Sequence, residues 1–194
     1  MVQLEETMTA ISLTHRQPLL ALAILFLCFA APAMAADAKG QSMTGDEAEL
    51  RSLLMAFMKP GADYQSLTQK LRPTPADYAS LLREPFATKA REVFESAYKN
   101  DEGVLKPKDG QTEVLLLSIM SDEIRLWTTR AKESMPGGYE AIRAEFKPGN
   151  RIYTARFVSP GQSAGLVIRM VVFVNGNWRV FPRVYALGSF KGSP

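Results

Sequence analysis

Two arginines and three aromatic residues in the second half of the chain have the chemistry of an anion-binding pocket. They are Arg169, Arg183, Trp127, Tyr153 and Trp178. A guanidinium presents several N–H donors in a rigid plane that matches the oxygens of a carboxylate or a phosphate, and aromatic rings provide apolar walls. We therefore expect a pocket for an anionic or amphipathic ligand, with Arg169 at its base.

Arg169 interrupts an otherwise apolar run, residues 165–174, and has two interpretations. A buried charge without a partner is strongly unfavourable, so a buried arginine needs a counter-charge. Asp122, Glu123 or Glu113 could provide it inside the fold. An anionic ligand could provide it instead, and the sequence leaves both interpretations open.

The adjacent carboxylates Asp122 and Glu123 are the alternative candidates, as the acid and base of a small hydrolase or isomerase that also uses Tyr chemistry. Either would need to face the cavity with a raised pKa. Neighbouring residues on a helix do not face each other, however, and acidic residues are common at helix N-termini because of the helix dipole. The sequence contains no phosphate-binding Gly loop, calcium-binding loop or nucleophile elbow. A binding protein is therefore favoured over an enzyme.

Residues 1–35 have the pattern of a cleavable secretory signal. Arg16 precedes an apolar core, Leu19–Ala31, which is too short to span a bilayer comfortably. The segment 33–35 (Ala-Met-Ala) follows as a small-x-small cleavage site, which places Ala36 at the mature N-terminus. We expect a periplasmic or secreted protein, and an uncleaved membrane anchor is the alternative.

Cleavage at this site removes Cys28 and His15, the only cysteine and histidine in the sequence. The mature chain could then form no disulfide, no Ser-His-Asp or Cys-His nucleophile system and no zinc site of the usual ligand type. An enzyme would have to rely on carboxylates, Lys, Tyr or Ser/Thr. We expect no metal and no cofactor.

The charge is distributed unevenly along the chain. Glu145 is the only acidic residue after Ile142, whereas basic residues are frequent there. This asymmetry favours an anionic partner, although basic residues on the outward face of a sheet would give the same pattern. We expect a small molecule, an envelope component or a protein as the partner, and no nucleic acid.

The first half of the chain predicts helices. After a polar, disordered lead at residues 36–43, Thr44 and Glu47 form a capping box in front of an apolar helical stripe. Asp63 can cap a second helix, and Thr74-Pro75 with Asp77 can start a third. Pro85 opens a longer helix. Its predicted apolar stripe consists of Phe86, Ala90, Val93, Phe94, Ala97 and Tyr98.

Strands dominate the second half. The apolar run 113–119 predicts a strand, and 121–131 predicts a helix because Ser-Asp-Glu is a good helix start, although 124–129 also alternates like a strand. A short helix that begins near Tyr139 and a strand at 151–158 follow.

The closing segment predicts a β-hairpin. Asn175-Gly176 joins two β-branched runs, and a type I′ turn there pairs Phe173 with Trp178, Val171 with Val180 and Arg169 with Pro182. Strict alternation then places Val167, Arg169, Val171, Phe173, Trp178, Val180 and Val184 on one face. Because Pro182 cannot donate to a ladder, the last strand, 177–185, is expected to be an edge there.

Helices followed by a strand meander that turns at Asn175-Gly176-Asn177-Trp178 resemble the NTF2-like/cystatin-like superfamily, over roughly residues 44–185. The resemblance implies helices packed into the concave face of a curved sheet, with a cone-shaped pocket between them. It implies no catalytic residue, because the superfamily includes enzymes and binding modules alike. A mature chain without histidine also departs from those of its enzymes that need one.

These features predict one α+β domain at residues 44–190, with N-terminal helices packed on a C-terminal four-stranded antiparallel sheet. The predicted function is that of a secreted or periplasmic, non-enzymatic binding module for an anionic or amphipathic envelope ligand or a protein partner. A homodimer through a sheet face is compatible with this interpretation.

Overall fold

The computed structural model describes residues 46–99 and 103–190 of the 194-residue chain. Its helical half contains α1 (Glu47–Met55), η1 (Ala56–Met58), α2 (Tyr64–Lys70), α3 (Pro75–Leu81) and α4 (Phe86–Lys99). Its second half contains β1 (Glu113–Met120), α5 (Ser121–Leu126), α6 (Thr129–Ser134), α7 (Gly138–Ala141), η2 (Arg143–Glu145), β2 (Arg151–Val158), β3 (Gly165–Val174), β4 (Asn177–Val180) and η3 (Val184–Phe190). The predicted signal, the polar lead and Thr44 lie outside the described residues.

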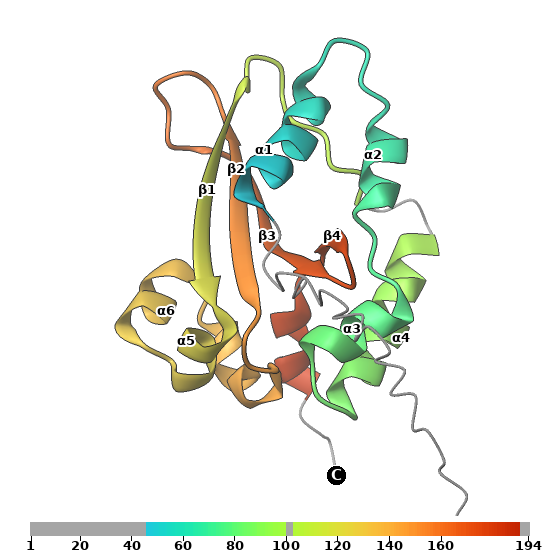
Figure 1. Ribbon diagram of the computed structural model, residues 1–194, viewed down its shortest axis with the longest axis vertical. Coiled ribbons are helices and arrows are strands. Elements are labelled where there is room, and N and C mark those ends of the chain that lie inside the picture. Colours follow the sequence, from blue (N-terminus) through green and yellow to red (C-terminus); the bar gives the residue numbers. More distant parts are fainter. Residues whose placement is uncertain (1–45, 100–102, 191–194) are drawn as a thin grey trace, which may run out of the picture. The chain divides into compact units, whose positions relative to one another are not determined.

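The four strands form one antiparallel sheet in the order β1-β2-β3-β4 (Figure 1). Helices precede the sheet in the chain, so the predicted α+β class is confirmed. The predicted pairs Phe173–Trp178 and Val171–Val180 are also confirmed. Positive φ values at Asn175 and Gly176 give the turn the geometry that a tight hairpin requires. Within the described residues, no helix combines the length and the hydropathy needed to cross a membrane.

Local capping fixes where the helices of the first half begin. Asp46 caps α1 by accepting a hydrogen bond from the amide of Ala48. Asp63 caps α2, and Thr74 with Asp77 forms a capping box at α3, both as predicted. In α4, Val93 is exposed although the stripe predicted it to be buried, and Ala87 is buried in its place.

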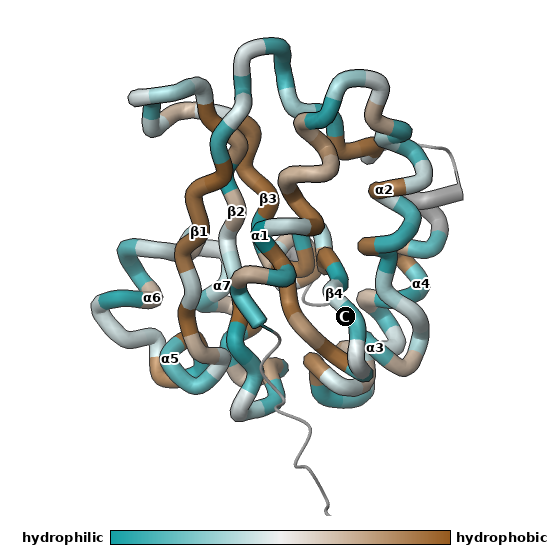
Figure 2. The backbone as a smooth tube through the Cα atoms, turned by 45° about the horizontal axis from the view of Figure 1, so that its top comes forward, coloured by the Kyte–Doolittle hydropathy of each residue, from teal (hydrophilic) through white to brown (hydrophobic). Residues whose placement is uncertain are grey.

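Each face of the sheet carries its own buried cluster. The strands that separate the clusters contain long hydrophobic stretches (Figure 2). Tyr153, Ala155 and Phe157 of β2 pack under α1 and η1 in one cluster. Ile152 of β2 and Val172 of β3 point to the other face and pack with residues of α3 to α7 and η3. Because successive side chains in a strand alternate between faces, both clusters are built from the same strands.

A β-bulge in β3 changes which side chains share a face. Tyr153 pairs with Val171 but Ala155 pairs with Ile168, so Arg169 and Met170 lie opposite the single residue between their partners. Met170 has a φ of 59°. The predicted alternation through Arg169 is therefore wrong. Ile168, and not Arg169, shares the buried face with Val171.

The last strand is shorter than predicted. β4 ends at Val180, and the Phe181 amide donates to the carbonyl of Met170 at 3.0 Å. Pro182 has no amide hydrogen, so the ladder stops there and the chain turns into η3. The predicted pair Arg169–Pro182 does not form.

The helix predicted at 121–131 is interrupted. α5 ends at Leu126, Trp127 takes a left-handed conformation with a φ of 51°, and Thr128 caps a new helix by accepting from the amide of Ala131. The alternative prediction, a strand at 124–129, is wrong as well. The strong capping signal of Thr128 explains why one helix became two.

Gly165 gives a direct test of the β2–β3 pairing. A Cβ at this position would lie 1.8 Å from the carbonyl oxygen of Phe157, which is fixed backbone. Gly165→Ala should therefore lower the free energy of unfolding by more than about 2 kcal/mol, as judged by chemical denaturation. Gly137→Ala is the matched control because a Cβ there meets no atom within 4 Å and φ is −55°. Equal effects of the two substitutions would contradict the pairing.

Candidate functional site

Tyr153 and Trp178 are core residues in this structure. Their rings form an edge-to-face pair with centroids 5.5 Å apart, and both are almost fully buried under α1. The indole Nε1 of Trp178 donates to Glu49 Oε2 at 3.3 Å. Burial raises the pKa of the Tyr153 hydroxyl above the usual value of a tyrosine.

Trp127 belongs to the other buried cluster, with the helices on the opposite face of the sheet. The three aromatic residues therefore do not line one pocket. Tyr153 points to one face of the sheet from β2, whereas Trp127 follows α5 on the other face.

Arg169 and Arg183 are exposed. Arg169 lies in the bulge, and Arg183 lies in the turn after β4 with a φ of 48°. Among the described residues, neither side chain makes a hydrogen bond or an ion pair. Arg169 is therefore not a buried charge, because the bulge turns it to solvent, and among the described residues it forms no ion pair with Asp122, Glu123 or Glu113.

The side chains of Asp122 and Glu123 make local contacts with backbone amides and with nearby arginines. Asp122 accepts from the amide of Gly149 at 2.8 Å, and Glu123 accepts from the amide of Met120 at 2.9 Å. Asp122 also lies 3.5 Å from Arg125, and Glu123 lies 3.7 Å from Arg130. Neither carboxylate reaches Arg169, and each is held in a separate network.

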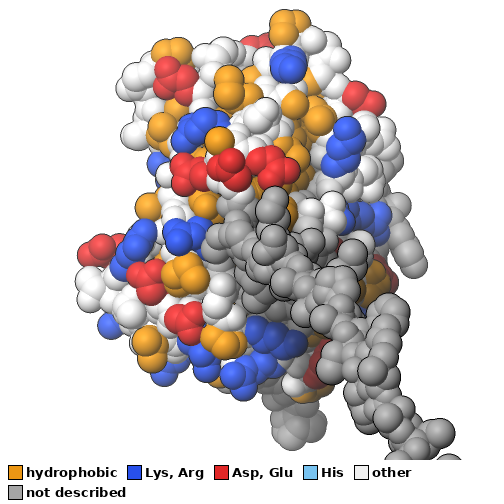
Figure 3. Space-filling model, viewed as in Figure 1, with side chains coloured by type: hydrophobic (Ala, Val, Ile, Leu, Met, Phe, Trp, Pro, Cys, Tyr) orange, Lys and Arg blue, Asp and Glu red, His pale blue; other side chains and the backbone are white. Residues whose placement is uncertain are grey.

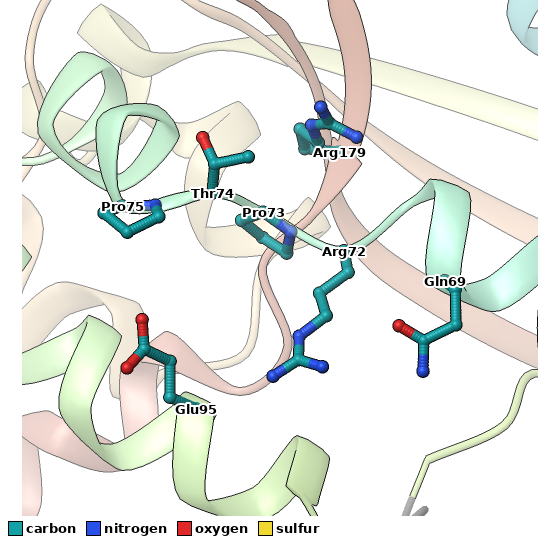
Figure 4. Close-up of a pocket in the computed structure, with 7 residues that line it drawn as sticks. All are labelled: Gln69, Arg72, Pro73, Thr74, Pro75, Glu95 and Arg179. Carbon is teal, nitrogen blue, oxygen red and sulfur yellow. The ribbon is translucent and has the colours of Figure 1, made fainter.

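A pocket of about 460 Å³ opens where the α2–α3 connection passes α4 and β4 (Figure 4). It is lined by Gln69, Arg72, Pro73, Thr74, Pro75, Glu95 and Arg179. None of the five residues predicted for binding lines it.

A buried carboxylate, Asp77, organises this region. Its side chain is 2% exposed and accepts four hydrogen bonds. Two come from the amide and hydroxyl of Thr74, at 2.7 and 2.8 Å. The others come from Asn175 Nδ2 at 2.7 Å and Arg179 Nε at 2.9 Å. Asp77 thus joins the start of α3 to the hairpin turn and to β4.

Arg179 is fixed in position before any ligand binds. Its Nε is held by Asp77, and its Nη1 donates to the carbonyl of Lys70 at 2.7 Å. The side chain is still 15% exposed and lines the pocket. Nη2 has no hydrogen-bond partner among the described residues, so it is available to an oxygen in the pocket. A donor fixed in this way loses little conformational entropy on binding.

Charges of both signs border the pocket. Arg72 extends from the α2–α3 connection and Glu95 projects from α4, as Figure 4 shows. Pro73 and Pro75 add apolar surface. The arrangement fits a ligand that has an anionic group for the arginines and a donor or a positive charge for Glu95.

The sequence identified Thr74 and Asp77 as the start of a helix, but it gave Arg179, Arg72 and Glu95 no role in a site. The contacts from Asp77 to Asn175 and Arg179 join residues 98 and 102 positions apart. No local pattern indicates such contacts.

Among the described residues, no group of three or more His, Cys, Asp or Glu side chains is placed to hold a metal ion. The chain matches no protein family, and the comparisons with curated proteins and with solved structures find no similar protein.

Removal of the Asp77 carboxylate should destabilise the protein strongly. Asp77→Ala leaves Arg179 and Asn175 without their partner, so we expect a loss of about 3–5 kcal/mol in the free energy of unfolding. Asp63→Ala is the matched control, because Asp63 caps α2 in an exposed setting, and it should cost about 1 kcal/mol. Urea denaturation of both variants measures the difference, and losses of similar size would show that Asp77 acts as a cap alone.

Tyr139 is a second buried polar group, outside the pocket. The residue is fully buried, and its hydroxyl has no hydrogen-bond partner among the described residues. Burial raises its pKa well above the usual value, and Tyr185 adds to the shift, whereas Arg169 opposes it. The folded state therefore keeps this proton at a pH where the unfolded chain has released it.

Tyr139→Phe should leave the stability unchanged or raise it by about 1 kcal/mol at pH 7, because it removes an unsatisfied buried hydroxyl. As the pH rises above about 10, the unfolded state binds fewer protons than the folded state, so the wild-type protein loses stability. The variant should lose less over the same range. Denaturation curves at pH 7 and pH 10.5 measure both effects, and a strong destabilisation at pH 7 would contradict the unsatisfied hydroxyl.

Proposed function

We propose that the protein is an exported, non-enzymatic binding module that takes an anionic or amphipathic ligand in the pocket beside α2, α4 and β4. The observation that carries the proposal is the fixed Arg179. Its guanidinium is anchored by Asp77 and Lys70, and among the described residues its Nη2 makes no hydrogen bond; the residue lines the pocket. Arg72 supplies a second positive charge on the same wall.

Export is supported by the sequence. The apolar core Leu19–Ala31 and the Ala-Met-Ala site before Ala36 have the arrangement of a cleavable signal. A periplasmic or secreted protein meets its ligand outside the cytoplasm, so an envelope component is the ligand class that we propose.

The pocket also limits the ligand's chemistry. Glu95 would repel a purely anionic molecule but would pair with an ammonium group or accept from hydroxyls. The volume of about 460 Å³ is within the usual range for small-molecule sites. We therefore propose a compact ligand with a phosphate or carboxylate at one end and a cationic or hydroxyl group at the other.

A distant relationship to the NTF2-like superfamily remains part of the proposal. It is supported by the order of helices before an antiparallel meander and by the Asn175-Gly176 turn. The enzyme alternative would need Asp122 or Glu123 in a cavity. Both instead accept hydrogen bonds from backbone amides, so no observation among the described residues favours it.

Three small phosphates test the pocket: inorganic phosphate, glycerol 3-phosphate and phosphoethanolamine. At a hundredfold excess over Kd, binding stabilises a protein by about 2.7 kcal/mol, a Tm rise of roughly 5–10 °C for a domain of this size. We expect the largest thermal shift with phosphoethanolamine, because its ammonium can pair with Glu95. Arg72→Ala should abolish the response, and Glu95→Gln should reduce it for phosphoethanolamine alone.

Arg169→Ala is the matched control, because it removes an exposed arginine that does not line the pocket. It should leave every thermal shift unchanged. If Arg169→Ala abolished binding and Arg72→Ala did not, the pocket assignment would be wrong. Native mass spectrometry of protein purified from its own envelope would then show which ligand accompanies it.

A further inference from the structure

We propose that the free edge of β1 is a docking site for the same edge of a second copy of this chain, and that Arg51 and Arg130 close this edge in the monomer. β1 pairs with β2 on one side and forms the end of the described sheet on the other. The proposal does not depend on the pocket function.

Contacts from outside the sheet show which backbone groups of β1 face the free edge. Arg51 Nη1 donates to the carbonyl of Val114 at 2.6 Å, and Arg130 Nη2 donates to that of Ser118 at 2.6 Å. The amide of Met120 donates to Glu123. In an antiparallel strand, the N–H and C=O of one residue point to the same side and alternate along the strand. Leu116 therefore also presents its amide and carbonyl outward.

The centre of this edge is open. Arg51 and Arg130 each donate a hydrogen bond to a backbone carbonyl, one on each side of Leu116. No side chain among the described residues makes a hydrogen bond to the backbone of Leu116 itself. The arginines are half exposed, and their ion pairs to Glu47 and Glu123 are long, at 3.6 and 3.7 Å. Exposed ion pairs of this length are weak, so the two glutamates hold the arginines only loosely over the edge. Charged side chains on an edge strand are a usual means of preventing unwanted pairing.

The hydrogen-bonding pattern is self-complementary. In antiparallel pairing about a twofold axis at Leu116, Val114 of one copy lies opposite Ser118 of the other, and all of these residues present outward N–H and C=O groups. The two carbonyls that the arginines occupy are the ones that this pairing would use.

In this register, the side chains of the two edge strands also match each other. Leu115 and Leu117 are 45% and 47% exposed, on the part of the sheet face that neither buried cluster covers. Leu115 of one copy would lie opposite Leu117 of the other, which gives a continuous row of leucines across the axis. Exposed leucines at adjacent positions of one strand face have no other role in the described structure.

Charge favours a second copy as the occupant. Glu47 and Arg51 form one neutral pair on α1, and Figure 3 shows acidic and basic side chains side by side over this helix. Glu123 and Arg130 form another neutral pair at the other end of β1. The twofold register brings the first pair of one copy beside the second pair of the other, so like charges are not forced together.

Sedimentation equilibrium of the full chain from 10 μM to 1 mM tests the docking, because a contact limited to one strand is small and weak. We expect reversible dimers, with a Kd at least tenfold lower in the Arg51→Ala, Arg130→Ala double variant, which frees the edge. The control is Arg83→Ala, Arg143→Ala, which removes two exposed arginines elsewhere and should not change Kd. A double edge variant that stays monomeric at 1 mM would overturn the proposal.

Disulfide trapping tests the register. Leu115→Cys and Leu117→Cys proteins, both with Cys28→Ser, are mixed under mild oxidation. Opposite residues in antiparallel strands lie within the Cα separation that a disulfide needs, whereas residues offset by two positions do not. The mixture should form the heterodimer, in which the two different variants are joined, at least tenfold faster than either protein forms its homodimer. Equal rates, or no trapping in the Arg51→Ala, Arg130→Ala background, would exclude this pairing.

Discussion

The buried carboxylate of Asp77 is the interaction on which the arrangement of this domain depends. A charge with a side chain that is 2% exposed is tolerable only when its oxygens are fully hydrogen-bonded, and four donors meet that requirement. Those donors come from the start of α3, the β3–β4 turn and β4. The same contacts that satisfy the charge therefore fix the helical half of the chain against the end of the sheet, and they hold Arg179 at the pocket.

The bulge in β3 is the second constraint. Without the extra residue, Arg169 would point into the face that Ile168 now fills, and its charge would need a partner there. The bulge moves one arginine to solvent and keeps the buried face apolar. On the other face, Met170 is covered by helices, whereas Leu115 and Leu117 of β1 are exposed.

Local sequence signals identified much of the fold. The caps at Asp63 and Thr74, the strands and the Asn175-Gly176 turn all depend on interactions within a few residues, and each was found. The bulge was missed because tertiary packing, and not residue type, sets the backbone conformation at Arg169 and Met170. The end of α5 was missed although Thr128 supplies a local cap for the next helix. The structure does not bring the five predicted site residues into one pocket. Arginines and aromatics indicated a plausible pocket chemistry, but a face assignment is shifted by a single inserted residue.

The span of the Asp77 contacts has a consequence for how the chain folds. Asn175 and Arg179 lie 98 and 102 residues further along the chain than Asp77. Their hydrogen bonds to Asp77 therefore cannot form until nearly the whole domain has been synthesised. Closing such long loops is entropically costly and slows folding. Slow folding leaves the chain unfolded for longer. In the export that we propose, this delay would help, because a secretion channel admits a chain that has not yet folded.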